Sequence, residues 1–175
     1  TDLRTGAAGG IAAKYLAPSH SVSLGIIGSG RQAAAQLDAI SVELDVREIK
    51  VWSRNEKNAV AFCGRYNTLD CGIASLEEAC SCDLLVTTTP SREPLIMDEW
   101  IHEGTHINAI GADAPGKEEL DPAILRRARV FVDDPAQAVH SGEINVPIQQ
   151  GLFSEAMIAG TLGEVVIGKK KRNSS

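Results

Sequence analysis

Gly28, Gly30 and Ala33 form the part of the sequence whose spacing most directly implies a chemistry. They give the pattern G-x-G-x-x-A between an apolar run at 22–27 and a helix-forming run that starts at Arg31. The first glycine permits a tight turn, the second leaves the backbone bare where a pyrophosphate approaches, and the small third residue lets the helix lie close to the strand. The N–H groups that open the helix then face the phosphates along a favourable dipole. An ordinary glycine turn is the alternative, but the flanking strand and helix favour a dinucleotide-binding site.

A second candidate is the carboxylate of Asp113, in a loop bounded by glycine and proline after the strand-forming run at 105–111. At the carboxyl end of a buried strand it could hold a substrate ammonium group, or move a proton as an amino acid becomes an imine. Asp also commonly caps turns in such loops, and the residues alone leave the two interpretations open. Lys117 in the same loop could reach a ligand or be a solvated charge.

The end of the second predicted strand bears on which nicotinamide cofactor fits. NAD-binding folds usually carry Asp or Glu there, which binds the ribose 2′-hydroxyl. Here the strand ends in Trp52-Ser53-Arg54-Asn55, without a carboxylate, and an arginine is suited to pair with a 2′-phosphate. We therefore favour NADP over NAD as the cofactor. In the alternative, Arg54 points into solvent and Ser53 bonds the ribose.

The elements that would position these residues alternate between helix and strand. Apolar periodicity and capping residues predict helices at 5–17, 31–43 and 56–66, a short one opened by the capping box Ser75-x-x-Glu78, and one that begins at Asp121-Pro122. Strands are predicted at 22–27, 49–53, 72–74, 83–90, 105–111 and, as the last one, 129–133. This alternation is typical of parallel βαβ units, so we expect an α/β fold with a doubly wound parallel sheet of the Rossmann type. We expect one domain over 1–172 and a disordered tail at 173–175.

Composition and charge exclude several classes of protein. The 175 residues are 43% hydrophobic and 23% charged, which suffices for one apolar core. No apolar run is long enough to span a membrane, and a net charge of −6 argues against a general nucleic-acid binder. The basic cluster at 169–172 is interpreted as a solvated helix end, with an anion-binding patch as the alternative.

The cysteines and histidines argue against a metal site. Cys63, Cys71, Cys80 and Cys82 include no C-x-x-C pair, and the histidines do not fall at zinc-ligand spacing. We expect no bound metal. Reduced thiols are typical of a cytoplasmic protein, which is the location we expect.

Several longer motifs resemble those of the ornithine cyclodeaminase/mu-crystallin family. They are LRTGAA at 3–8, the Gly28-x-Gly30-x-Gln32 turn, TTTPS at 87–91, HINAIGADAPGKEEL at 106–120 and GEIN at 142–145. The similarity covers nearly the whole chain, and within the family it is strongest to the alanine dehydrogenases of the archaeal type. It implies the Rossmann-type nucleotide-binding domain of that family. The family's other domain, which carries dimerisation and the catalytic lysine, is expected to lie outside these residues, so this chain alone is expected to be inactive.

The resemblance implies roles for residues near the phosphates and the reacting atoms. Asp113 matches the family's catalytic aspartate. Arg4 would contact the pyrophosphate and lie near the substrate carboxylate. Arg31 and Gln32 would supply backbone contacts to the phosphates at the helix start.

The remaining cofactor contacts follow from the same resemblance. Ser53 would lie beside the adenosine ribose. Thr89, Ile110 and Gly111 would line the nicotinamide end, and Lys117 would reach the cofactor.

Three functions remain open. The first is an NAD(P)-dependent amino-acid oxidoreductase, alanine dehydrogenase-like, in which hydride moves between the substrate Cα and nicotinamide and water hydrolyses the imine. The second is an ornithine cyclodeaminase-type lyase that converts ornithine to proline and ammonia. The third is a non-enzymatic NADPH-dependent binding protein of mu-crystallin type. The expected partners are a small amino or imino acid and, at full length, a second copy of the chain; neither nucleic acid nor membrane is expected.

Overall fold

The structure is a computed structural model that describes residues 2–172, so the predicted tail at 173–175 lies outside the described residues. The chain divides into two compact units. Of the described residues, the first unit comprises 2–88 and 100–108, and the second comprises 89–99 and 109–172. The residues predicted to bind phosphates and ribose belong to the first unit. Those predicted to line the nicotinamide end, together with the predicted catalytic Asp113, belong to the second.

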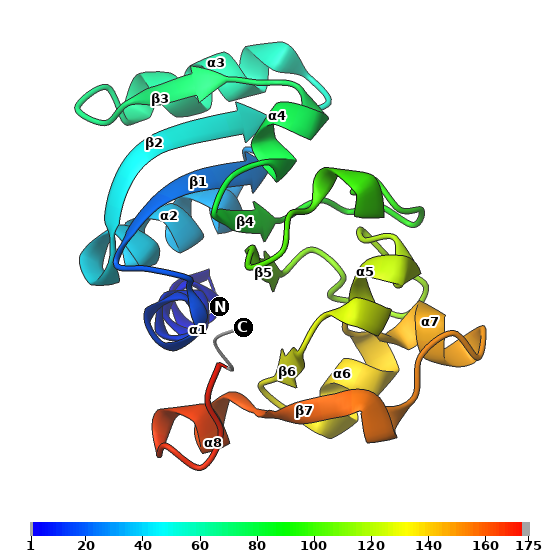
Figure 1. Ribbon diagram of the computed structural model, residues 1–175. Helices are drawn as coiled ribbons and strands as arrows, with labels where there is room; N and C mark the ends of the chain where they lie inside the picture. The colour runs from blue at the N-terminus through cyan, green and yellow to red at the C-terminus, as the bar shows by residue number, and fades with distance from the viewer. Residues whose placement is uncertain (1, 173–175) are drawn as a thin grey trace. The chain divides into compact units, whose positions relative to one another are not determined.

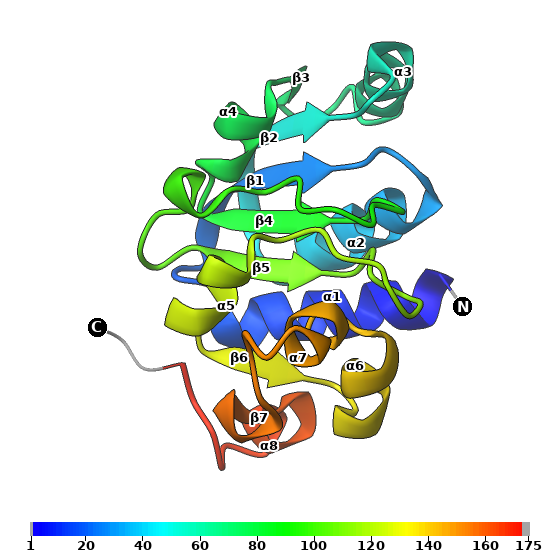
Figure 2. The same ribbon diagram turned by 90° about the vertical axis from the view of Figure 1, so that its right-hand side faces the viewer.

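A five-stranded sheet forms the centre of the first unit, in the order β3-β2-β1-β4-β5 (Figure 1). Its strands are β1 (Ser21–Ile27), β2 (Asp45–Trp52), β3 (Cys71–Ile73), β4 (Leu84–Thr87) and β5 (His106–Ala109). β1 pairs in parallel with β2 and with β4, β2 pairs in parallel with β3, and Figure 2 shows the arrows of β1, β4 and β5 running the same way. The strand order reverses between β1 and β4, which confirms the predicted doubly wound parallel sheet.

Helices cover both faces of this sheet. They are α1 (Asp2–Leu16), α2 (Arg31–Glu43), α3 (Glu56–Arg65) and α4 (Leu76–Cys80). Alternate residues of β1, beginning with Val22, are fully buried in one core with side chains from α1, α2 and α3. Gly25 points to the opposite face, because side-chain directions alternate along a strand, and lies against the backbone of Ala79 in α4.

The predicted helix starts are confirmed by their capping bonds. Asn55 accepts the N–H of Lys57 at the start of α3, at 3.1 Å. Ser75 and Glu78 make both bonds of the capping box that opens α4. Asp121 accepts an N–H from the first turn of its helix.

Small residues on α1 let it lie directly on α2. An added Cβ at Gly6 would come within 2.6 Å of a backbone oxygen of α2, and one at Gly9 would lie 1.9 Å from the side chain of Gln36. Gln36 is fully buried and donates to the carbonyl of Thr5, while its oxygen accepts from Asn108 on β5. A polar network therefore joins α1, α2 and β5 inside an otherwise apolar core.

Several strand boundaries differ from the prediction. β2 begins at Asp45 rather than at residue 49, since its polar first half still pairs with β1. β4 ends at Thr87 because the chain then leaves the sheet towards Pro90, which has no N–H to donate. Ser53 therefore follows β2, and Thr89 follows β4, as loop residues.

The second unit contains a separate two-stranded parallel sheet. Its elements are α5 (Pro122–Arg127), β6 (Val130–Val132), α6 (Pro135–Ser141), α7 (Asn145–Gln149), η2 (Glu155–Met157), β7 (Ile158–Thr161) and α8 (Leu162–Val166). β6 pairs with β7, so the prediction of 129–133 as the last strand was wrong. The run that forms β7, Ile-Ala-Gly-Thr, lacks the apolar alternation that marks a strand. Within residues 2–172 no helix is long and apolar enough to cross a membrane.

Candidate functional site

The glycine turn after β1 is built as the sequence predicts. Gly28 has a φ of +96°, a conformation that side chains resist, and its N–H donates to the carbonyl of Trp52 at 2.9 Å. An added Cβ would also lie 2.8 Å from the hydroxyl oxygen of Thr88. The turn therefore requires glycine on two independent grounds, and its bond to Trp52 brings the end of β2 beside it.

The first turn of α2 has the properties of an anion-binding helix start. Gly30 is the N-cap residue, makes no side-chain capping bond, and is followed by a first turn without acidic residues. A Cβ added at Gly30 would meet no atom within 4 Å. The chain itself leaves this space open, beside N–H groups that carry the positive end of the helix dipole. These features fit a bound pyrophosphate.

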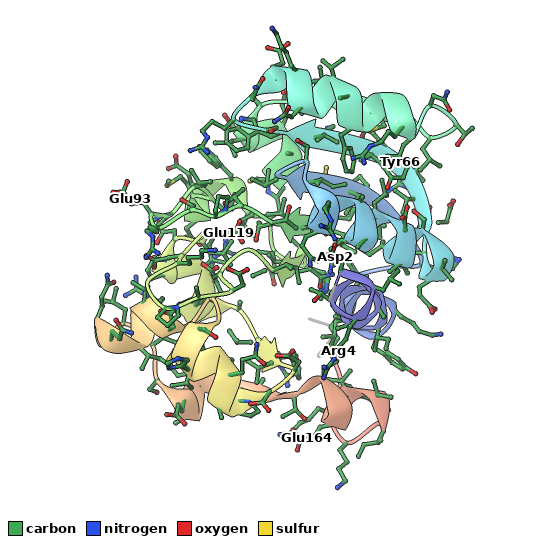
Figure 3. The ribbon with its side chains drawn as sticks, turned by 180° about the vertical axis from the view of Figure 1, so that it is seen from behind. Asp2, Arg4, Tyr66, Glu93, Glu119 and Glu164 are labelled. Carbon is green, nitrogen blue, oxygen red and sulfur yellow. The ribbon has the colours of Figure 1, made fainter. Side chains whose placement is uncertain are left out.

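Asp2, which the sequence did not single out, contacts this helix start from α1. Its carboxylate accepts hydrogen bonds from Arg31 and, at 2.9 Å, from the side-chain amide of Gln32. Figure 3 shows Asp2 on the side of α1 that faces α2. The side chains of Arg31 and Gln32 are thus held by Asp2, and the backbone contacts expected between these two residues and a phosphate stay a prediction.

Arg4 lies on a different side of α1. It is exposed, and Figure 3 shows it across the helix from Asp2, as expected for residues two positions apart in a helix of 3.6 residues per turn. Its predicted contact with the pyrophosphate stays a prediction.

The end of β2 presents the residues on which the choice of cofactor depends. Ser53 is half-buried and Arg54 is exposed, directly after Trp52. The side chain of Asn55, the next residue, already accepts the hydrogen bond from Lys57 that caps α3. Ser53 and Arg54 are therefore the side chains that this strand end offers to an adenosine ribose.

In the second unit, Thr89 and Gly111 are brought together by a residue that sequence reasoning missed. The buried carboxylate of Glu119 accepts the N–H and the hydroxyl of Thr89 at 2.6 and 2.7 Å, and the N–H of Gly111 at 2.9 Å. The hydroxyl of Thr89 thus points into the protein rather than towards a ligand. Ile110, the third residue predicted for the nicotinamide end, is half-buried beside Gly111.

Asp113 and Lys117 form an ion pair, with 2.5 Å between Lys117 Nζ and an Asp113 carboxylate oxygen. The Asp113 side chain is 72% exposed and that of Lys117 is 20% exposed. The side chain of Asn145 holds their loop in place, because it accepts a hydrogen bond from the N–H of Gly116 and donates one to the carbonyl of Lys117, both at 3.0 Å. The loop therefore presents an accessible carboxylate on a backbone fixed by a fully buried amide.

Glu143 is a buried acid whose charge depends on pH. One of its oxygens accepts the N–H groups of Glu119 and Leu120, and the other has no hydrogen-bond partner among the described residues. Burial raises the pKa of this carboxyl to about 8; the bond from Leu120 opposes the shift, and the charge of Glu119 adds to it. Glu143 is therefore largely protonated at neutral pH.

This raised pKa predicts that stability falls as the pH rises. Between the ordinary glutamate value of 4.5 and about 8, the folded form binds a proton at Glu143 that the unfolded form has lost. The free energy of unfolding should therefore decrease through this window, by up to about 1.4 kcal/mol per pH unit. Glu143→Gln removes that contribution, which urea unfolding of both proteins at about pH 5, 6, 7 and 8 would measure. If the free energy of unfolding changed with pH in the same way in both proteins, the pKa of Glu143 would not be raised.

Sequence reasoning missed Asp2, Glu119, Glu143 and Asn145 because charged or amide side chains are usually solvated. The motif GEIN contains two of them, and only its resemblance to the family marked it. No group of three or more His, Cys, Asp or Glu side chains within residues 2–172 is arranged to hold a metal ion.

The sheet order, the positive-φ glycine turn and the uncapped helix that follows define a Rossmann-type fold of the dinucleotide-binding class. The model of the ornithine cyclodeaminase/mu-crystallin family matches residues 1–175, and the chain belongs to that family. The resemblance stated from the motifs is thereby confirmed.

Individual relatives agree with this assignment. Alanine dehydrogenase of Archaeoglobus fulgidus is 50% identical over 178 residues, which cover 100% of this chain and 55% of that protein. A solved archaeal alanine dehydrogenase, a dimer with bound NAD, matches with a TM-score of 0.95 at 49% identity, over 99% of this chain and 55% of the other. The Δ1-pyrroline-2-carboxylate reductase of Thermococcus litoralis, solved with NADH and L-proline, matches with a TM-score of 0.94 at 36% identity, over 100% and 56%. The chain thus spans about half the length of the curated relatives it matches.

Proposed function

We propose that this protein binds a nicotinamide adenine dinucleotide at the start of α2 and, at its natural length, acts as an alanine dehydrogenase-like amino-acid oxidoreductase. The observation that carries the proposal is the uncapped first turn of α2, which follows the Gly28 turn and leaves open space at Gly30. The NAD and NADH bound to the two similar solved enzymes support it.

The residues of the first unit would hold the adenosine and phosphate half of the cofactor. The N–H groups of Gly30, Arg31 and Gln32 would donate to the phosphates, where the helix dipole favours negative charge. Ser53 would bond the ribose, and Arg4 would add a positive charge near the pyrophosphate. Support comes from the bond that brings Trp52 beside the Gly28 turn.

The residues of the second unit would act at the reacting end. When bound, the cofactor supplies the hydride chemistry. Thr89, Ile110 and Gly111 would line the nicotinamide, and Lys117 would reach the cofactor. Asp113 would accept the proton that the substrate ammonium group loses, and the freed nitrogen lone pair would form the C=N bond of the imine as hydride leaves Cα. Water then converts the imine to a 2-oxo acid and ammonia. The exposure of the Asp113 carboxylate supports this role.

Arg54 is proposed to select NADP over NAD by pairing with the 2′-phosphate. Arg54→Ala is then expected to weaken NADPH binding about 10-fold, which corresponds to roughly one charge-assisted hydrogen bond, and to change NADH binding less than about 2-fold. Fluorescence titration with each nucleotide measures this, with Arg126→Ala as the control for loss of an exposed arginine. An unchanged ratio of the two affinities would leave Arg54 in solvent, with Ser53 as the ribose contact.

The proposal is tested on the protein at its natural length. NADPH and NADH are titrated separately while nicotinamide fluorescence is followed, and NAD(P)H oxidation is then assayed with pyruvate and ammonium. Binding together with ammonium-dependent oxidation is the expected result. Failure to bind either nucleotide would overturn the proposal.

A cyclodeaminase is the second candidate, because ornithine cyclodeaminase gives the matching family part of its name. Its first step is the same hydride transfer, so Asp113 serves both reactions and cannot separate them. Proline and ammonia formed from ornithine without net change of the cofactor would favour this lyase. Retained nucleotide binding without either activity would favour a binding protein of mu-crystallin type.

A homodimer and a cytoplasmic location belong to the same proposal. The dimeric state of the similar archaeal alanine dehydrogenase supports the first, and the four free cysteines support the second. Light scattering after size-exclusion chromatography would measure the mass in solution.

A further inference from the structure

Glu119 is a fully buried acidic residue of the second unit, labelled in Figure 3. A carboxyl group away from water is costly unless its oxygens are hydrogen-bonded. Both oxygens of Glu119 are: one accepts the N–H and the hydroxyl of Thr89, and the other accepts the N–H of Gly111. The distances of 2.6, 2.7 and 2.9 Å are those of well-formed hydrogen bonds.

These three bonds join two loops that are distant in sequence. Thr89 follows β4 and Gly111 follows β5, at the carboxyl ends of neighbouring strands, where ligands bind in such sheets. The loops touch closely: an added Cβ at Gly111 would lie 2.2 Å from the carbonyl oxygen of Thr89 and 2.6 Å from the side chain of Glu119. Only glycine at 111 permits this approach, and Glu119 keeps it in place.

The backbone of Glu119 is itself held on both sides. Its carbonyl accepts the N–H groups of Leu95 and Ile96 at 2.8 and 3.0 Å. Its N–H donates to the carboxyl of Glu143 at 2.8 Å. The carboxylate therefore extends from an anchored point of the chain, so that its orientation determines where Thr89 and Gly111 lie.

We infer that Glu119 is a positioning residue: by bonding Thr89 and Gly111 at once, it holds their two loops in the arrangement that receives the nicotinamide end of the cofactor. The inference rests on the proposed function, which assigns those two residues to that end. Glu119 acts through them, because its two oxygens are used by the loops. Misplacement of a positioning group by about 1 Å can lower a rate about 100-fold.

Glu119→Gln tests this at almost constant volume. One oxygen remains to accept from one loop, but the new NH2 group faces a backbone N–H donor of the other loop, so the link between the loops breaks. In the protein at its natural length we expect kcat to fall about 10- to 100-fold, while the Kd for NADH or NADPH changes less than about 3-fold, because the phosphates bind elsewhere, at α2. Rates come from NAD(P)H oxidation with pyruvate and ammonium, and Kd values from nicotinamide fluorescence.

Glu118→Gln is the matched control. Glu118 is also buried, but one of its oxygens has no hydrogen-bond partner within residues 2–172, and the carboxylate that bonds both loops is that of Glu119. The same substitution there should change kcat and Kd less than about 2-fold. An unchanged kcat in Glu119→Gln would overturn the inference while leaving the proposed function intact. A fall in kcat that is accompanied by weaker nucleotide binding and a lower melting temperature would also overturn the inference, because it indicates general destabilisation. Wild-type protein that binds neither nucleotide would instead refute the proposed function.

A second pair of variants decides the case if Glu119→Gln does not fold. Thr89→Val removes the hydroxyl that donates to Glu119 and keeps the shape, while Thr89→Ser keeps the hydroxyl. We expect kcat to fall several-fold in the valine variant and to be several-fold higher in the serine variant than in the valine variant, because serine keeps the bond to Glu119. Equal kcat values in the two variants would count against the inference.

Discussion

Replacing Gly30 with valine is expected to abolish dinucleotide binding without unfolding the protein. The backbone there, at φ −83° and ψ −167°, is extended and open to any residue, and an added Cβ meets no atom within 4 Å. A side chain would instead fill the space proposed for the pyrophosphate. We expect an affinity loss of about 100-fold or more, roughly 3 kcal/mol, with little change in melting temperature. Fluorescence titration and thermal unfolding of the same sample measure both.

Two other glycines provide the controls for that result. A Cβ at Gly72 on β3 also meets nothing within 4 Å, so Gly72→Val should bind like wild type. Gly28→Val should lose stability as well as binding, because its φ is +96° and Thr88 occupies the space beside it. Normal binding by Gly30→Val would mean that the pyrophosphate does not lie over Gly30.

Asp113→Asn is expected to lower kcat by about 100- to 10,000-fold, the range typical for loss of a general acid or base. The amide keeps the size of the side chain but cannot accept a proton, and it removes the charge that pairs with Lys117. Folding should change little, because the Asp113 side chain is 72% exposed and an ion pair screened by solvent contributes about 1 kcal/mol or less. Nucleotide affinity should be retained, because the proposed phosphate contacts lie at α2. Steady-state rates and fluorescence titration separate the two effects.

Asp70→Asn is the control for this substitution, since Asp70 is likewise an exposed aspartate and lies in the first unit. Its rates should equal those of wild type. A kcat for Asp113→Asn within about 3-fold of wild type would leave Asp113 with a structural role in its loop and no part in proton transfer.

The parts of the fold that sequence predicted are those fixed by local chemistry. Gly28 needs its φ whatever the rest of the chain does, and Asn55 reaches an N–H only two residues away. The capping box at Ser75 and Glu78 is equally local. Such features depend on short stretches of sequence, so the glycine turn before α2 and most helix boundaries could be predicted.

What could not be predicted depends on partners that are distant in sequence. From the sequence alone, Glu119 would be taken for a solvent-exposed acidic residue. Its role becomes visible only in the fold, where it bonds Thr89, which lies 30 residues earlier. Asn145 is explained by bonds to Gly116 and Lys117, again far away in sequence. Strand β7 has too weak an apolar pattern to be recognised and exists because β6 pairs with it. The sequence therefore marked the exposed residues of the candidate site, whose roles stay predictions, but not the buried side chains that hold their loops.

The close contact between α1 and α2 also determines how α1 tolerates substitution. Gly6, Gly9, Gly10 and Ala13 are buried, whereas Ala7, Ile11 and Lys14 are exposed. A saturation library of this helix would therefore show intolerance recurring every three to four residues, although small residues stand on both faces. At Gly9 even one methyl group displaces Gln36, and through it the bond to Asn108. The helix that precedes the glycine turn is thus coupled mechanically to the edge strand of the sheet, and a change in side-chain size at one position of α1 would be transmitted across α2 to β5.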